Sequence, residues 1–83
     1  MAKYDPLHDY LRKRRRHAIL GMGFADIERV IGAMLPNRAM LPQWWENRPS
    51  ERGHVQCRAW REAGYDALLL EGDRVVFTGR RRR

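Results

Sequence analysis

The 83-residue chain has few of the groups that disulfide scaffolds, catalysis or membrane insertion require. Its one cysteine, Cys57, excludes an internal disulfide and a zinc site built from cysteines. Its one serine, Ser50, belongs to no plausible Ser–His–Asp set, and no glycine-rich phosphate loop is present. No apolar run approaches 18 residues, and the first ten residues lack the apolar core of a signal peptide. We therefore expect a cytoplasmic protein that is not an enzyme.

Metal and acid–base chemistry are equally poorly represented. His54 and Cys57 are three positions apart on an expected helix, but two ligands without a third do not make a metal site. Asp5, Asp9 and Asp26 fit helix caps and surface positions better than a catalytic carboxylate pair. We expect no catalytic residue, no metal and no cofactor.

Positive charge is abundant. The chain has 17 Lys+Arg against 10 Asp+Glu, a formal net charge of +7, and all but Lys3 and Lys13 of these cations are Arg. Guanidinium groups bind phosphate in bidentate geometry and stack on bases, so the composition favours a polyanionic partner. A G+C-rich genome gives the same bias without any function. Nine of the 17 cations lie in residues 12–16 and 80–83, which are also compatible with a solvated helix end and a free tail.

Apolar periodicity and turn residues predict six elements. In order they are a helix from Asp5 into residues 12–16, a strand at 18–20, a helix at 24–31, a helix from between 50 and 54 to Gly64, and strands at 67–70 and 75–78. This α-β-α-α-β-β order, with three helices and a small antiparallel hairpin or sheet, predicts an α+β fold like the winged helix-turn-helix. We expect a single domain over residues 1–79, followed by a disordered basic tail at 80–83.

Local signals refine this expectation. Asp5 is predicted to cap the first helix, with Pro6 at its first position, and Gly32 to end the second. The irregular residues 33–50 are expected to hold at least one helical turn and one tryptophan packed into the core. Gln56 falls on the apolar arc of the third helix, so its amide needs a specific partner, and Asn47 is a further candidate to bond an indole N–H.

The fold and the charge together predict binding of duplex DNA, as in a small transcriptional or nucleoid regulator. The polar arc of the third helix would face the major groove, the basic clusters would bind phosphates, and the hairpin tip would make a wing contact. The candidate groove residues are Arg52, His54, Arg58 and Arg61. The candidate phosphate-binding residues are Arg12, Lys13, Arg14, Arg15, Arg16, Arg74, Arg80, Arg81, Arg82 and Arg83.

Other interpretations stay open at the level of sequence. The third helix can present an ordinary exposed face, with Arg58 and Arg61 paired to nearby acids. Glu71 and Asp73 flank Arg74 in a position that opposes phosphate binding. A second function is a protein-interaction module, an adaptor or inhibitor in phage defence or toxin control, that binds an acidic protein. A third is an RNA or single-strand binder that stacks bases on Trp44 or Trp45.

Motifs spread over nearly the whole chain resemble a family of small, mostly uncharacterised bacterial domains. They are Tyr4-Asp5-Pro6-Leu7, Tyr10-Leu11, Phe24-Ala25-Asp26-Ile27-Glu28, Ile31-Gly32, Leu35-Pro36, Trp44-Trp45-Glu46-Asn47, His54-Val55-Gln56, Arg58-Ala59-Trp60, Ala63-Gly64-Tyr65 and Val75-Val76-Phe77. The chain departs from the family pattern at Gly23, where a capping Ser or Thr is expected, and at Cys57, where Ala is expected. The resemblance implies a self-contained fold of bacterial origin and no particular activity.

Overall fold

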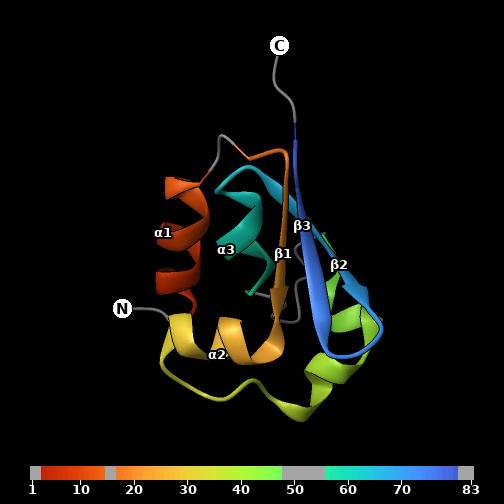
Figure 1. The fold of residues 1–83 in the computed structure, drawn as a ribbon. Coiled ribbons are helices and arrows are strands. Elements are labelled where there is room, and N and C mark those ends of the chain that lie inside the picture. Colours follow the sequence, from red (N-terminus) through yellow and green to blue (C-terminus); the bar gives the residue numbers. More distant parts are fainter. Residues whose placement is uncertain (1–2, 15–16, 48–55, 81–83) are drawn as a thin grey trace.

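A computed structural model describes residues 3–14, 17–47 and 56–80 (Figure 1). In order, the elements are α1 (Asp5–Lys13), β1 (Ile19–Gly23), α2 (Phe24–Ile31), the 3-10 helices η1 (Asn37–Met40) and η2 (Pro42–Trp45), α3 (Cys57–Arg61), β2 (Tyr65–Leu70) and β3 (Arg74–Gly79). The predicted α+β order of three helices and three strands is confirmed.

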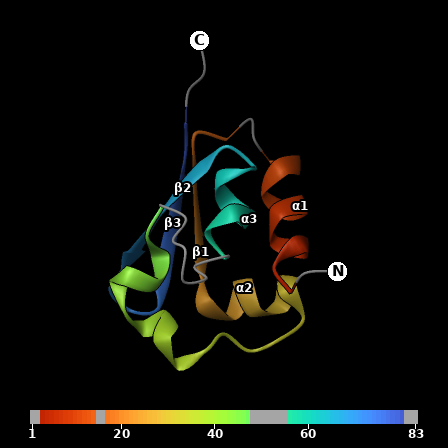
Figure 2. The same ribbon diagram turned by 180° about the vertical axis from the view of Figure 1, so that it is seen from behind.

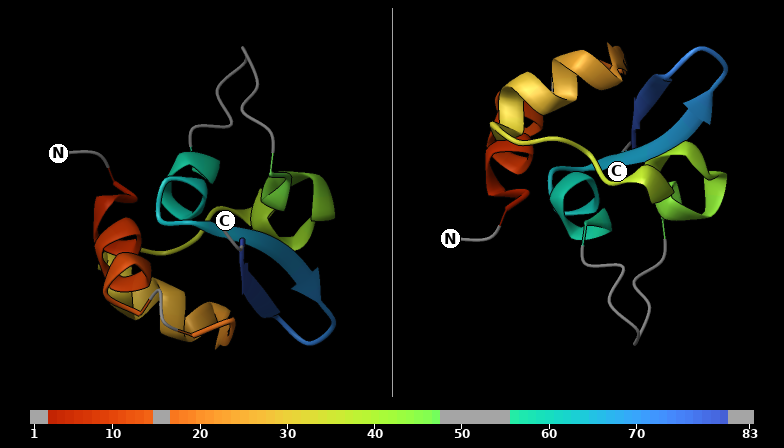
Figure 3. Two further views of the ribbon diagram at one scale, coloured as in Figure 1. Left: turned by 90° about the horizontal axis from the view of Figure 1, so that it is seen from above. Right: turned by 90° about the horizontal axis from the view of Figure 1, so that it is seen from below.

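The three strands form one antiparallel sheet in the order β1-β3-β2. Thr78 pairs with Ile19 of β1 and with Asp66 of β2, and Arg74 pairs with Gly23 and Leu70 at the other end of the sheet. All described helices lie on one side of the sheet, and α1 packs against both α2 and α3 (Figures 2 and 3). The sheet therefore has an inner face that borders the core and an outer face that no described element covers.

The helical stripes expected from the sequence supply this core. Leu7 and Leu11 on α1, and Ile27 and Ile31 on α2, are spaced four residues apart and are buried. The predicted N-cap of α1 was wrong by one residue. The carbonyl of Tyr4 accepts hydrogen bonds from the N–H groups of Leu7 and His8, so Tyr4 is the cap, and Asp5 lies inside the first turn.

Helix α2 has its predicted bounds, although Gly23 offers no capping side chain. The Gly23 N–H donates to Oδ2 of Asp26 at 3.1 Å, and the Phe24 N–H donates to the Asp73 carbonyl at 2.8 Å. The hairpin turn thus completes the cap from a distant part of the chain. Gly32 ends the helix as predicted, in the left-handed region at φ 71°.

The strands are longer than predicted. β1 extends through Gly21 to Gly23, beyond the predicted 18–20, because β3 supplies a paired neighbour over the whole segment. β2 and β3 likewise extend beyond the predicted strands at 67–70 and 75–78. The turn Glu71–Asp73 joins them. Gly72 and Asp73 both have positive φ there, at 73° and 59°.

The connection from α2 to α3 is much longer than the three- or four-residue turn of a compact helix-turn-helix. The expected helical turn is present twice, as η1 and η2, and both Trp44 and Trp45 are buried instead of one. The predicted start of the third helix lies at 50–54, outside the described residues. That helix ends at Arg61 and not at Gly64, which instead turns the chain into β2 with φ 94°.

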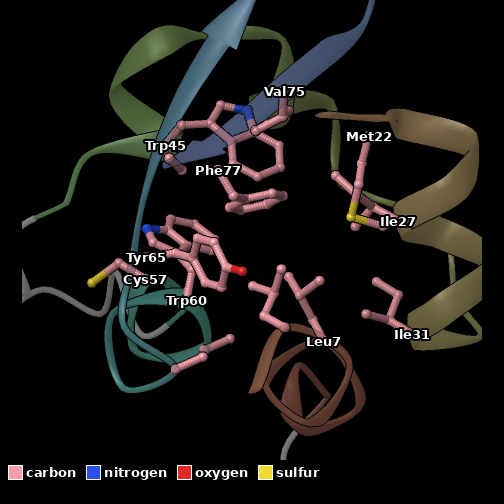
Figure 4. Close-up of a cluster of buried hydrophobic side chains, with 14 of the residues drawn as sticks. Leu7, Met22, Ile27, Ile31, Trp45, Cys57, Trp60, Tyr65, Val75 and Phe77 are labelled. Carbon is pink, nitrogen blue, oxygen red and sulfur yellow. The ribbon is translucent and has the colours of Figure 1, made fainter. Parts of the chain in front are cut away.

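The core is built around aromatic rings (Figure 4). Trp60 of α3 is 0% exposed and lies between Trp45 and Phe77, with ring centroids 5.3 Å and 6.0 Å away. The predicted apolar arc of the third helix is confirmed among its described residues, since Cys57, Ala59 and Ala63 are also buried. Helix α3 is therefore anchored by its inner side and offers little side-chain surface outward.

Candidate nucleic-acid interface

The last turn of α1 carries the first basic cluster. Arg12 and Lys13 are exposed, and no described carboxylate forms an ion pair with either. The Arg14 guanidinium lies 3.7 Å from the centroid of the Tyr10 ring, and its Nη1 donates to the Tyr10 carbonyl at 3.2 Å. Arg14 is thereby held in one orientation while Arg12 and Lys13 extend into solvent. Arg15 and Arg16 follow in the chain and lie outside the described residues.

Tyr65 joins this cluster to the sheet. Its hydroxyl oxygen lies 2.6 Å from the carbonyl oxygen of Arg14 and 3.0 Å from that of His17. Burial raises the pKa of Tyr65, an effect that the positive charge of Arg14 partly offsets, so the hydroxyl stays protonated and can donate. The end of α1 is consequently fixed against the first residue of β2.

Arg80 brings a further cation to the same place. Its Nη2 donates to the Arg61 carbonyl at 2.9 Å, its Nε lies 3.6 Å from Oδ1 of Asp66, and its backbone N–H donates to the Gly64 carbonyl at 2.7 Å. The expectation that residue 80 begins a disordered tail was therefore wrong for Arg80, because β3 delivers it to the turn between α3 and β2. Arg81, Arg82 and Arg83 lie outside the described residues.

These contacts gather cations from three parts of the chain at one end of the sheet, where β1 and β2 begin and β3 ends (Figure 1). We call this region the basic end and define it by Arg12, Lys13, Arg14, Arg61 and Arg80. Arg61 is half-buried and donates to the Asn47 carbonyl. It therefore adds positive charge to the basic end, but its side chain is not free to contact a ligand. Asp66 is the acid that this network holds close to the basic end.

The predicted groove-facing surface of the third helix is not formed by its described residues. The side chains of Arg58 and Glu62 make an exposed ion pair, with Nε and Oε2 3.2 Å apart, and Arg61 is bound to backbone. Arg52 and His54 lie outside the described residues. Of the two alternatives weighed for this face, the structure favours the ordinary exposed surface, because acid and backbone groups lie next to its cations.

Arg74 is separated from the basic end by the length of β3. It begins that strand beside the turn containing Glu71 and Asp73, so two carboxylates are its sequence neighbours. Six residues of strand span about 17–20 Å. Arg74 therefore lies at the opposite end of the sheet from the other described phosphate-binding candidates, which are Arg12, Lys13, Arg14 and Arg80.

The two tryptophans that the alternative single-strand function would use for base stacking lie inside the molecule. Trp44 and Trp45 are 8% and 2% exposed, and the Trp45 Nε1–H donates to the Ala39 carbonyl at 2.8 Å. Their rings contact one another with centroids 4.7 Å apart. The proposed stacking of single-stranded bases on these two rings was therefore wrong, since neither presents a free face.

Asn47 and Gln56 have the internal partners that the sequence led us to expect. Oδ1 of Asn47 accepts from the Trp60 indole at 2.8 Å and from the Ala67 N–H at 2.7 Å, while its Nδ2 donates to the Ala67 carbonyl at 3.0 Å. Gln56, which is 4% exposed, donates to the Trp44 carbonyl at 2.9 Å. Tyr65 could not be predicted from the sequence, because its partners are 51 and 48 residues away and no local pattern marks them.

The described residues contain no group of three or more His, Cys, Asp or Glu side chains placed to bind a metal ion. Cys57 is buried, and burial raises its pKa, against a smaller lowering by Arg61 and Arg58. Among the described helices, none is both long and apolar enough to span a bilayer.

Comparison with known proteins gives a family but no activity. No curated protein and no solved structure matches the chain. Residues 4–81 match the model of a family described as "Domain of unknown function (DUF7662)". Since the match covers nearly all of its 83 residues, the chain belongs to this family of uncharacterised domains.

Proposed function

We propose that this domain is a non-catalytic nucleic-acid-binding protein that holds the phosphate backbone of duplex DNA at its basic end. The observation that carries the proposal is the pair of links from Tyr65 to the end of α1 and from Arg80 to the end of α3. These links bring separate cationic segments together, although each cation repels the others. A polyanion is the partner that relieves this repulsion.

The geometry favours phosphate contacts over base recognition. Arg12 and Lys13 are exposed at a helix end, whereas Arg58 pairs with Glu62 and α3 has only five residues in the described structure. Phosphate contacts position a protein on DNA without discriminating sequence. The domain should therefore bind duplexes of unrelated sequence with similar affinity and with strong salt dependence.

A fluorescence-anisotropy titration with one duplex at several salt concentrations tests this function. The double variant Arg12→Gln/Lys13→Gln should weaken binding and make the slope of log K against log salt shallower by about 2, since each phosphate contact contributes about 0.9. The matched control is Arg29→Gln/Arg38→Gln, which removes the same number of exposed positive charges from α2 and η1. This control should bind almost as the parent does.

Equal weakening by the two double variants would show that net charge alone drives binding and would remove the basic end as the site. No binding at low salt, or binding insensitive to salt, would contradict the function itself. Stoichiometric capture of an acidic protein by a chain that ignores duplex would replace it with the adaptor function.

A further inference from the structure

The outer face of the sheet carries an apolar patch that the proposed function does not use. Alternation along the strands and the register of the sheet place its members on adjacent strands of one face. We define the outer patch by Ile19, Gly21, Leu68, Leu70 and Val76. Ile19, Leu68 and Leu70 are 66%, 59% and 45% exposed.

This patch is continuous across the three strands. Gly21, Val76 and Leu68 form its central row across the three strands, because Gly21 pairs with Val76 and Val76 pairs with Leu68. A Cβ at Gly21 would have no atom within 4 Å, so nothing in the described structure fills the space above it. Adjoining apolar residues on an open sheet face offer a place where a second surface can dock.

Charge at the two ends of the same face identifies the partner. Asp66 lies one row beyond the centre toward the basic end, and Arg74 lies one row beyond it toward the turn. Consider two copies whose outer faces meet and that are related by a two-fold axis lying between the faces, perpendicular to the strands and passing over Val76. Each strand then lies over the same strand of the other copy and runs in the opposite direction. Arg74 of each copy is consequently one strand away from Asp66 of the other. Packed sheets lie about 10 Å apart and neighbouring strands about 5 Å, distances that an arginine side chain spans. The alternative axis, parallel to the strands, would set Arg74 against Arg74.

We propose that the outer patch is the interface of a homodimer in which two sheets pack face to face with antiparallel strands, joined by reciprocal Arg74–Asp66 contacts. The patch measures about 15 by 17 Å from strand spacing and rise, which is less than the roughly 800 Å² per partner of a standard stable interface. The dimer is therefore weak and forms in the micromolar to millimolar range. The basic ends lie at opposite ends of this dimer, where both remain accessible.

Sedimentation equilibrium of the full chain, free of nucleic acid, measures this association directly. Leu68→Lys should weaken it by about tenfold or more, because a charge would have to be desolvated in an apolar contact. Met34→Lys is the matched control, since Met34 is 75% exposed and lies outside the sheet. It should associate as the parent does, and circular dichroism confirms that both variants are folded.

Charge reversal tests the orientation of the two copies. Asp66→Lys and Arg74→Glu should each lower self-association, and an equimolar mixture of the two variants should recover it, because both cross-contacts then pair opposite charges. Arg80→Gln controls for loss of the internal Arg80–Asp66 ion pair, and it should not lower association, because Asp66 stays available to Arg74 of the other copy. A merely structural effect of the two reversals would not be repaired by mixing.

A parent chain that stays monomeric up to millimolar concentration would overturn the proposal. So would equal effects of Leu68→Lys and Met34→Lys, or a mixture of the charge-reversed variants that associates no better than either alone. These measurements contain no nucleic acid, so their failure leaves the proposed function standing, and failure of duplex binding leaves the dimer standing.

Discussion

Two polar regions of this domain, the Asn47 cluster and the basic end, use their polar groups in opposite ways. In the Asn47 cluster, Trp60 and Ala67 give both the oxygen and the nitrogen of one side-chain amide specific partners inside the fold. At the basic end, Arg12 and Lys13 have no described carboxylate partner. The Tyr65 hydroxyl binds the backbone at the end of α1 and leaves these two side chains free. Satisfied buried groups specify a structure, whereas exposed cations without a carboxylate partner are available to an anionic ligand.

The largest expected effect comes from breaking the Asn47 cluster. Asn47→Leu leaves the Trp60 indole N–H and both backbone groups of Ala67 without partners, and it should lower the free energy of unfolding by about 3–5 kcal/mol. Thermal and urea unfolding measure this. Asn37→Leu, an exposed control at the start of η1, should change stability by less than about 0.5 kcal/mol.

An Asn47→Leu variant as stable as the parent would show that the three bonds do not organise this region. If the variant does not fold, Asn47→Asp keeps the Oδ1 acceptor and allows the comparison to be made in a milder form.

Tyr65→Phe sharpens the comparison because the Tyr65 side chain attaches the basic end to β2, the strand that also contains Ala67 of the Asn47 cluster. The substitution removes the hydroxyl that binds the carbonyls of Arg14 and His17 but keeps the buried ring. We expect a loss of about 1–2 kcal/mol in stability, together with weaker duplex binding, because the end of α1 is released from β2. Calorimetry and anisotropy on the same preparation test both. Weaker binding with unchanged stability, or the reverse, would separate the two roles.

Alkaline pH should act on the same hydroxyl. Burial raises the pKa of Tyr65 in the folded chain, whereas the unfolded chain has the ordinary value near 10. Above that pH the unfolded chain loses the Tyr65 proton before the folded chain does. The contribution of this hydroxyl to the free energy of unfolding is therefore fully present below about pH 10. It falls as the pH rises, by at most about 1.4 kcal/mol per pH unit. The free energy of unfolding of Tyr65→Phe should fall less steeply with pH than that of the parent. Both proteins keep the contribution of Tyr4, whose pKa is also raised by burial. Parallel slopes would contradict this assignment.

The smallest effect is expected on the outer side of α3. Arg58→Gln removes an exposed pair with Glu62 and should change stability by about 0–0.5 kcal/mol, with duplex binding unchanged. Unfolding curves and the same anisotropy titration measure it. A clear loss of binding would place Arg58 at the nucleic acid and return α3 to the interface.

The sequence predicts those features that depend on neighbours in the chain. The bounds of α2, the buried arc of α3 and the left-handed Gly32 follow from periodicity and local backbone preference. Glycines in β1 and the place of Arg80 do not, because β3 and the turn after α3 decide them through pairing across the fold. The division of cations between two ends of the sheet was missed for the same reason. The predicted strand at 75–78 already sets Arg74 and Arg80 at its opposite ends, but spacing along the chain does not say which of these ends the last turn of α1 will join.

The link between Tyr65 and Arg14 also sets an order of events during synthesis. Its two residues are 51 positions apart, and β1 pairs with a strand whose residues lie still later in the chain. Contacts of such separation form late, because a long loop must close before they can stabilise anything. A nascent chain therefore carries Arg12, Lys13 and Arg14 before β2 and β3 can hold them in place, and we expect the proposed duplex binding to begin only after β3 has been made.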